Sequence, residues 1–392
     1  MTAQVLTLGY LPLTDAAPLI VAHELGFAAE EGLDLRLLRL ASWAQSRDLL
    51  GAGVIDAAHM LVPMPIAQSL GLGPALPDVD LVMVLSQGGQ VIAVSSDLAT
   101  TMRAAGHSFD FADPVAAGSA LLRGSGGRLR VGVPFPFSTQ AELVWHWLGA
   151  SGFDRAGVEV VTVPPPMMAG AVARGEVDAF CVGEPWASFA VETSVAALLL
   201  PGKAIWASPP EKGLVLRRDF IETRGDDTGR LMRAIWRAGR WLDRPENRGT
   251  AAEIVSRADY LNLPSELAER GLTGRLLVSP AGEMRQLRDF IAFHEGAATF
   301  PWKSLAAFFA GRIARRHGLE VAPAMERAMG CFRSDIYRQM LRPAGADLPG
   351  ASAKVEGSMR HAHAVASEKG RMILRPDAFF DGHIFEPPFA RR

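Results

Sequence analysis

The sequence contains the same short pattern twice. Residues 53–57 and residues 175–179 both read Gly-x-(Ile/Val)-Asp-Ala, and each copy follows a segment with helical periodicity. Each copy also leads into a short apolar run that is followed by a proline, Pro65 or Pro185. Glycine often ends a helix in the left-handed conformation, so each copy predicts a helix end and then a strand. Two copies at the same place in an α/β succession indicate two related lobes.

Short apolar runs alternate with helical segments as far as about residue 220. The runs expected to form strands are 5–11, 33–40, 80–85, 91–95, 129–134 and 158–163. The segments expected to form helices between them are 16–31, 43–51, 140–149 and 167–174. Later segments with mainly helical character are 227–242, 251–260, 283–295, 302–317 and 324–341. Strands separated by helices predict parallel sheets made of βαβ units.

We therefore expect an α/β fold with two lobes, an interlobe cleft and a helical C-terminal extension. Residues 1–90 together with 205–392 are expected to form lobe I and the extension, and residues 91–204 lobe II. Ligands of such sheets bind where strand carboxyl ends and helix amino ends converge, so the cleft between the lobes is the expected binding site.

Charge and cysteine content exclude several classes of protein. A net charge of −2 gives no electrostatic reason to expect binding to nucleic acid. Two cysteines, Cys181 and Cys331, cannot form a disulfide framework and fit a reducing compartment. The first basic residue is Arg36, so the amino terminus lacks the positive start of an export signal, and the apolar stretch 195–200 is too short to span a bilayer. We expect a cytoplasmic protein without membrane insertion.

Two predicted helix starts suggest an anionic ligand. Ser42-Trp43-Ala44-Gln45 and Thr139-Gln140-Ala141-Glu142 both fit the capping-box pattern. The free N–H groups and the dipole of a helix amino end favour an anion, and two such ends facing one cleft would reinforce each other. Capping boxes also occur as purely structural helix starts, and this alternative remains open at this point.

Several motifs, in order along nearly the whole chain, resemble the nitrate- and bicarbonate-binding proteins of cyanobacterial-type ABC importers. The amino-terminal motifs are Leu8-Gly9-Tyr10-Leu11-Pro12-Leu13-Thr14-Asp15, Ser42-Trp43 with Arg47-Asp48, Gly89-Gln90, Gly183-Glu184-Pro185-Trp186 and Pro210-Glu211-Lys212. The later motifs are Phe300-Pro301-Trp302-Lys303-Ser304, Phe332-Arg333-Ser334-Asp335-Ile336-Tyr337 and Phe379-Phe380-Asp381-Gly382. The resemblance implies a two-lobed, type II periplasmic-binding-protein-like fold.

The resemblance also implies a nitrate pocket made by Trp43, Gln90, Gly183 and Lys212. Gln140 stands where the family's histidine is expected, which bears on the identity of the ligand. Nitrate is a planar, monovalent acceptor: Lys212 would balance its charge, Gln90 and Gln140 would donate amide N–H groups, Gly183 would donate its backbone N–H, and Trp43 would supply a flat wall or an indole donor. No cofactor and no metal are expected, although calcium would matter if the ligand were bicarbonate.

The expected cellular compartment of the protein distinguishes two subgroups of this family. Importer components are exported, whereas this chain shows no export signal, so the resemblance implies a cytoplasmic nitrate/nitrite sensor of nitrate assimilation. Such sensors release an RNA-binding antitermination regulator when nitrate or nitrite arrives, and that protein is the implied partner. The alternative is the substrate-binding component of a nitrate or bicarbonate ABC transporter.

An enzyme of the same fold is the alternative from another class. Pyrimidine-precursor synthases and some menaquinone-pathway enzymes share the two-lobed architecture. The synthases carry a cysteine-rich motif, and this chain has only isolated cysteines. His361 and His363 stand in a polar tail, where histidines are usually solvated. We therefore expect a binding protein and not an enzyme.

Overall fold

In each copy of the repeated pattern, the aspartate forms hydrogen bonds to a neighbouring parallel strand, and the two copies lie in different sheets. In the computed structural model, which describes residues 3–388, Asp56 N donates to Thr7 O at 2.8 Å, and Asp56 Oδ2 accepts from Thr7 N at 2.8 Å. Asp178 repeats both contacts with the backbone of Arg130, each at 2.9 Å. The two aspartates therefore have the same structural role in two separate sheets.

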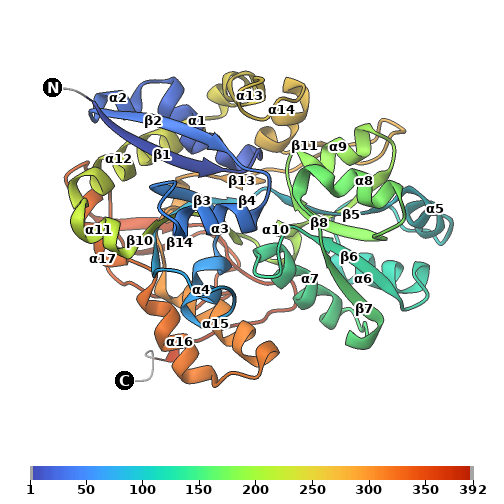
Figure 1. The fold of residues 1–392 in the computed structure, drawn as a ribbon. Coiled ribbons are helices and arrows are strands. Elements are labelled where there is room, and N and C mark those ends of the chain that lie inside the picture. The colour runs from blue at the N-terminus through green and yellow to red at the C-terminus, as the bar shows by residue number, and fades with distance from the viewer. Residues whose placement is uncertain (1–2, 389–392) are drawn as a thin grey trace.

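The two sheets form the centres of the two lobes (Figure 1). The first has six strands in the order β13-β4-β10-β3-β1-β2. These strands are β1 (Gln4–Tyr10), β2 (Leu33–Arg39), β3 (Ala57–Leu61), β4 (Val79–Gly88), β10 (Pro210–Arg217) and β13 (Ile291–Ala292). The second has five in the order β7-β6-β8-β5-β9. These are β5 (Gln90–Ser95), β6 (Leu129–Val133), β7 (Val158–Thr162), β8 (Ala179–Gly183) and β9 (Ala196–Pro201).

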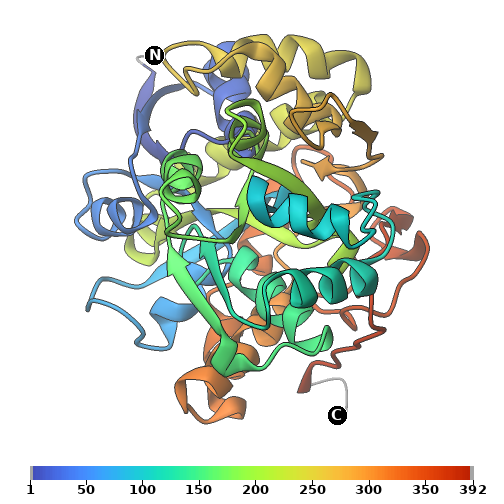
Figure 2. The same cartoon turned by 90° about the vertical axis from the view of Figure 1, so that its right-hand side faces the viewer.

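Helices cover both sheets, and Figure 2 looks onto those of the five-stranded lobe. Around the six-stranded sheet lie α1 (Ala17–Glu24), α2 (Phe27–Glu30), α3 (Trp43–Gly51) and α4 (Pro63–Ser69). The five-stranded lobe holds α5 (Ser96–Ala104), α6 (Pro114–Gly124), α7 (Thr139–Ala150), α8 (Met168–Ala173) and α9 (Trp186–Glu192), followed by α10 (Gly202–Ile205). The rest of the chain adds α11 (Arg218–Thr223), α12 (Gly225–Leu242), α13 (Arg248–Ser256), α14 (Ser265–Thr273), α15 (Lys303–His317), α16 (Val321–Gly330) and α17 (Ser334–Leu341). Two small hairpins pair β11 (Arg275–Leu277) with β12 (Met284–Gln286) and β14 (His363–Ser367) with β15 (Gly370–Leu374).

The chain passes between the sheets in two places. It leaves the first sheet at Gly88, where β4 ends, and enters the second at Gln90, where β5 begins. It returns between β9 and β10, through residues 202–209. We propose that the lobes divide near residues 90 and 205, because both sheet changes fall there.

Two expected helices are each divided in two. The helix expected over residues 16–31 ends at α1 and restarts at α2, because Gly26 between them has a φ of +74°, which is outside the helical range. The helix expected over residues 324–341 is interrupted between α16 and α17. There Cys331 O accepts from Leu81 N at 2.8 Å and Arg333 N donates to Leu81 O at 2.9 Å, so the chain pairs with β4 instead of continuing the helix.

The helix expected over residues 283–295 is wrong. This segment holds β12 and the short edge strand β13, in which Ile291 pairs with Gly88 at the lobe crossing. Asp289 has a φ of +53°, which no α-helix accommodates, and the Phe290 carbonyl accepts from Gly89 N at 2.9 Å. Tertiary pairing with β4 thus overrides the local helical pattern.

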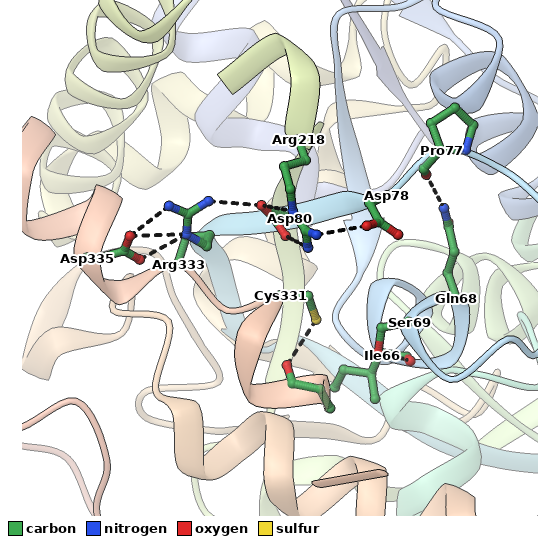
Figure 3. Close-up of polar contacts among 11 residues, drawn as sticks. Ile66, Gln68, Ser69, Pro77, Asp78, Asp80, Arg218, Cys331, Arg333 and Asp335 are labelled. Carbon is green, nitrogen blue, oxygen red and sulfur yellow. Dashed lines mark hydrogen bonds and ion pairs between the residues drawn. The ribbon is translucent and has the colours of Figure 1, made fainter. Parts of the chain in front are cut away.

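The carboxylate of Asp80 anchors the C-terminal extension to the six-stranded sheet (Figure 3). Asp80 lies on β4 and is fully buried. It accepts from Arg218 Nη2 at 2.8 Å and from Arg333 Nη1 at 3.0 Å. Arg218 belongs to α11, and Arg333 directly precedes α17, so one carboxylate joins three separate parts of the chain.

None of the helices between residues 3 and 388 combines the length and the apolar character needed to cross a membrane.

Replacing Asp80 by asparagine should lower the free energy of unfolding by about 2–3 kcal/mol, because two guanidiniums lose a charged acceptor. The matched control is Asp335→Asn. Asp335 pairs with the same Arg333, but its side chain is 59% exposed, so the expected loss is about 0.5 kcal/mol or less. Urea denaturation of both variants measures the difference, and equal losses would show that Asp80 is not the anchor.

Candidate functional site

The residues expected to form the pocket come together where the two lobes meet. Gln90 on β5 pairs with Gly183 on β8, at the edge of the five-stranded sheet that faces the other lobe. Lys212 on β10 pairs with Leu61 on β3 in the six-stranded sheet. All three predicted residues are buried. The crossing from β4 to β5 therefore brings parts of both sheets to one junction.

A buried cluster of charges surrounds Lys212. Its ammonium nitrogen lies 2.7 Å from Asp15 Oδ2 and 2.5 Å from Glu211 Oε1. It also lies 5.3 Å from the centre of the ring of Trp43, which is the first residue of α3. Lys212, Asp15 and Glu211 have side-chain exposures of 0%, 2% and 0%, so water contributes almost nothing to balancing their charges.

Gln140 connects this cluster to the second lobe. It lies in the first turn of α7, and its Nε2 donates to Glu211 Oε1. The preceding Thr139 donates its hydroxyl to Pro210 O at 2.7 Å. The expected capping box at Thr139 is wrong by one residue, because Ser138 is the helix cap and accepts from Ala141 N at 3.0 Å. This shift leaves the Thr139 hydroxyl free to reach the opposite lobe.

The first expected capping box forms its cap at Ser42, while the returning bond of Gln45 reaches the residue before the cap. Ser42 Oγ accepts from Gln45 N at 3.2 Å, and Gln45 Oε1 accepts from the backbone N–H of Ala41 at 2.8 Å. The helix α3 therefore begins at Trp43, as the sequence predicts, with the indole ring facing Lys212.

Further hydrogen bonds hold the two lobes against each other. The Glu184 carbonyl accepts from the Thr14 backbone at 2.9 Å and from its hydroxyl at 3.0 Å. The indole N–H of Trp186 donates to Pro12 O at 2.7 Å. Both contacts join the turn after β1 to the segment after β8, so the described arrangement is one in which the lobes are closed.

Gly183 lies in a position where a side chain would crowd the charged cluster. A Cβ atom added there would lie 3.0 Å from Leu13 Cδ2 and 3.6 Å from Asp15 Oδ2. Gly202 stands in a similar relation to Gln90, because a Cβ on Gly202 would lie 2.7 Å from Gln90 Cγ. Small residues at both places let the backbone approach the junction.

Three residues of the junction were not assigned to the pocket from sequence. Asp15 and Glu211 stand within motifs that carry the family resemblance, and their carboxylates are the partners of Lys212. His59 Nε2 lies 3.0 Å from Asp15 Oδ1, and its ring centre lies 5.8 Å from that of Trp43. Two features of the sequence could have indicated them. His59 is the single histidine in the apolar run 57–61, and Glu211 stands beside Lys212 in a chain that has few lysines.

Burial governs the protonation of this cluster. Burial raises the pKa of Glu211 to about 7, with Asp15 acting in the same direction and Lys212 and Gln140 opposing it. Burial acts to raise the pKa of Asp15 too, but Lys212 and His59 outweigh it and lower the pKa. Burial lowers the pKa of His59 despite Asp15, which favours the neutral ring. The cluster thus holds one ammonium, one carboxylate and, in Glu211, a second carboxyl group poised to take a proton near neutral pH.

Several buried polar atoms at the junction have no hydrogen-bond partner within residues 3–388. They include Trp43 Nε1, both amide atoms of Gln90, Gln140 Oε1 and Glu211 Oε2. A buried polar atom without a partner costs about 1–3 kcal/mol, so such a group of atoms in one place points to a ligand that supplies the missing contacts. Within the described residues, no three or more His, Cys, Asp or Glu side chains are placed to hold a metal ion.

The NMT1-like family matches residues 2–256, which is more than half of the chain. The chain belongs to the NMT1-like family. Its relatives include the nitrate/nitrite binding protein NrtA of Synechococcus elongatus, 28% identical over 97% of this chain and 83% of the relative. The bicarbonate-binding protein CmpA of Synechococcus is 28% identical over 90% of this chain and 82% of the relative. These relatives are named as binding proteins, in agreement with the expectation that the chain is not an enzyme.

A solved structure has the same fold over almost the full length. The periplasmic nitrate-binding protein NrtA from Synechocystis superposes with a TM-score of 0.83 at 25% identity, covering 99% of this chain and 97% of that one. The zinc-bound ligand-binding component of an ABC-type import system from Staphylococcus aureus superposes with a TM-score of 0.66 at 16% identity, which supports the fold alone. The expected periplasmic-binding-protein-like fold is therefore confirmed.

Proposed function

We propose that this chain binds nitrate between its lobes, as the solute-binding component of an ABC-type importer. The observation that carries the proposal is the pair of buried N–H donors without partners, on Trp43 and Gln90, at the lobe junction, where the Trp43 ring lies 5.3 Å from the Lys212 ammonium. Nitrate has three oxygen acceptors and no donor, so these N–H groups suit it. The names of the relatives NrtA and CmpA support a small oxyanion as the ligand.

Each predicted pocket residue has a distinct role in this proposal. Trp43 Nε1 and Gln90 Nε2 donate to nitrate oxygens, and the Gly183 backbone comes close because the residue has no side chain. Lys212 supplies the positive charge. Gln140 differs from its expected role, because it donates one amide N–H to Glu211. It therefore acts on the ligand mainly by holding Glu211.

The charge balance makes nitrate binding a proton-linked event. With Asp15 and Glu211 both ionised, the single positive charge of Lys212 is already exceeded. An anion added to a buried site with excess negative charge is strongly disfavoured. Protonation of Glu211 removes that excess and releases one ammonium N–H of Lys212 toward nitrate. Nitrate binding therefore takes up a proton from solution whenever Glu211 begins ionised.

The importer assignment has more support than the sensor assignment. The relatives NrtA and CmpA are named as nitrate/nitrite-binding and bicarbonate-binding proteins, and the Synechocystis NrtA structure is that of a periplasmic protein, where an importer component would work. The release of an antitermination regulator and a cytoplasmic location remain predictions from the sequence. A sensor would use the same anion-binding junction, so the two functions differ in partner and not in ligand.

Lys212→Met should weaken nitrate binding by about 100-fold or more, because a buried cation that faces the anion is lost. Isothermal titration of the folded variant measures the loss. The control is Lys369→Met, which removes an exposed lysine in the turn between β14 and β15 and should leave affinity unchanged. A second variant, Gln90→Leu, keeps the charge cluster and should still weaken binding. Unchanged affinity in Lys212→Met and Gln90→Leu would remove the junction as the site.

Nitrate affinity should be highest below pH 7 and should fall as the pH rises through the pKa of about 7 of Glu211. The direction follows because the ionised carboxylate repels the anion, and the steepest fall for one proton is about tenfold per pH unit. Replacing Glu211 by glutamine should flatten this dependence between pH 6 and 8. A variant that keeps the full native slope would show that another group takes up the proton.

A sensor would form a complex that depends on nitrate. Gel filtration of the chain co-expressed with the antitermination regulator of its own organism tests this, with and without nitrate or nitrite. Under the importer proposal we expect no complex in either condition. A complex that nitrate dissociates would overturn the importer assignment in favour of the sensor.

A further inference from the structure

A cavity of about 280 Å³ lies between α7 of the five-stranded lobe and α15 of the C-terminal extension. Trp145 and Leu148 of α7, together with Phe153 beyond it, form an apolar wall. Arginine side chains form much of the remaining lining. The cavity is separate from the interlobe junction, because none of its lining residues belongs to the Lys212 cluster.

Four arginine residues line this cavity, and no aspartate or glutamate does. Arg312, Arg315 and Arg316 are spaced three and four residues apart on α15, which puts them on one side of the helix. Arg155 enters from the segment before β7, with its guanidinium carbon 5.1 Å from the centre of the Trp145 ring. We call these four residues the arginine cluster.

One buried carboxylate partly compensates the arginine cluster. Glu142, one turn before Trp145 on α7, has a side-chain exposure of 3%. It accepts from Arg312 Nε at 2.9 Å and from Arg316 Nη1 at 2.8 Å. Glu142 therefore holds two guanidiniums in place behind the cavity, and four positive charges share one negative charge.

The other polar contacts leave this imbalance in place. Arg312 Nη1 also lies 3.2 Å from His146 Nδ1, and the carboxylate of Asp381 faces the other ring nitrogen of His146 at 3.1 Å. The side chains of Arg315 and Arg155 make no hydrogen bond or ion pair within residues 3–388, and the Arg155 guanidinium lies over the Trp145 ring. In contrast, Arg218 and Arg333 at the Asp80 anchor each contact two carboxylates.

We propose that the arginine cluster and the apolar wall form a second binding site, for a small organic dianion that carries a flat apolar group. Planar guanidinium forks match the paired oxygens of phosphate and carboxylate groups. The aromatic wall of Trp145 and Phe153 would cover a ring that an inorganic anion lacks. At about 280 Å³ the cavity lies just below the usual range of about 300–1,000 Å³ for ligand pockets, so its occupant has to be small, such as one ring with one dianionic group.

Occupancy of this site would be linked to lobe closure. The apolar wall and Glu142 belong to the five-stranded lobe, whereas Arg312 and Arg316 belong to the extension that is anchored to the other sheet. A dianion that contacts both the five-stranded lobe and the extension would stabilise the closed form. By linkage, it would also tighten nitrate binding. This consequence rests on the proposed function, whereas the binding test below does not.

The test uses phenyl phosphate and inorganic phosphate as probes in calorimetric titrations of the full chain, at an ionic strength of about 0.15 M. We expect phenyl phosphate to bind at one site, and more tightly than inorganic phosphate. Arg315→Gln removes an exposed guanidinium that supports no other contact, and should weaken phenyl phosphate binding about tenfold, as expected for one charge-assisted hydrogen bond. The matched control is Arg327→Gln on the exposed side of α16, which should leave the affinity unchanged.

Three results would overturn the proposal. One is the absence of phenyl phosphate binding to the native chain. Another is an equal effect of Arg315→Gln and Arg327→Gln, which would indicate general attraction to a basic surface. The third is displacement of phenyl phosphate by saturating nitrate, which would place the probe in the interlobe junction. If the native chain binds phenyl phosphate as expected but does not bind nitrate, the proposed function is contradicted and the second binding site is not.

Discussion

The buried ammonium of Lys212 is the interaction on which the junction depends. An isolated charge without water is very costly, so the fold has to supply counterions around it. Asp15 comes from the turn after β1 and Glu211 from β10 itself. Gln140 then ties Glu211 to the opposite lobe. One cation therefore organises elements from both sheets, and removal of any carboxyl group changes the charge at the place where the lobes close.

Two further sets of contacts support this junction: equivalent aspartates within the two sheets, and ion pairs that hold the C-terminal extension. Asp56 and Asp178 bind equivalent strands in the two sheets, which gives both lobes the same pair of parallel strands within a mixed sheet. Asp80 binds the C-terminal extension to the first sheet through Arg333. Because the extension also supplies Arg312 to Glu142 of the second lobe, the closed arrangement is supported at two separate places.

Much of the architecture could be predicted from local patterns. The repeated Gly-x-(Ile/Val)-Asp-Ala motif predicted two lobes, and the Ser42 cap predicted the start of α3 at Trp43, because both signals depend on a few neighbouring residues. The segment 283–295 could not be predicted, since its conformation depends on pairing of Ile291 with Gly88 far away in sequence. The predicted pocket residues lie together, but Asp15 and His59 were missed because only the fold brings them to Lys212.

The most direct test of proton-linked nitrate binding is the number of protons taken up as nitrate binds. Calorimetric titration near pH 8, in two buffers with different ionisation enthalpies, measures this number. We expect uptake of close to one proton per nitrate in the native chain and near zero in Glu211→Gln, since Glu211, with a pKa of about 7, is mostly ionised at that pH. Nitrate binding with no proton uptake in the native chain would contradict the role assigned to the Lys212 cluster.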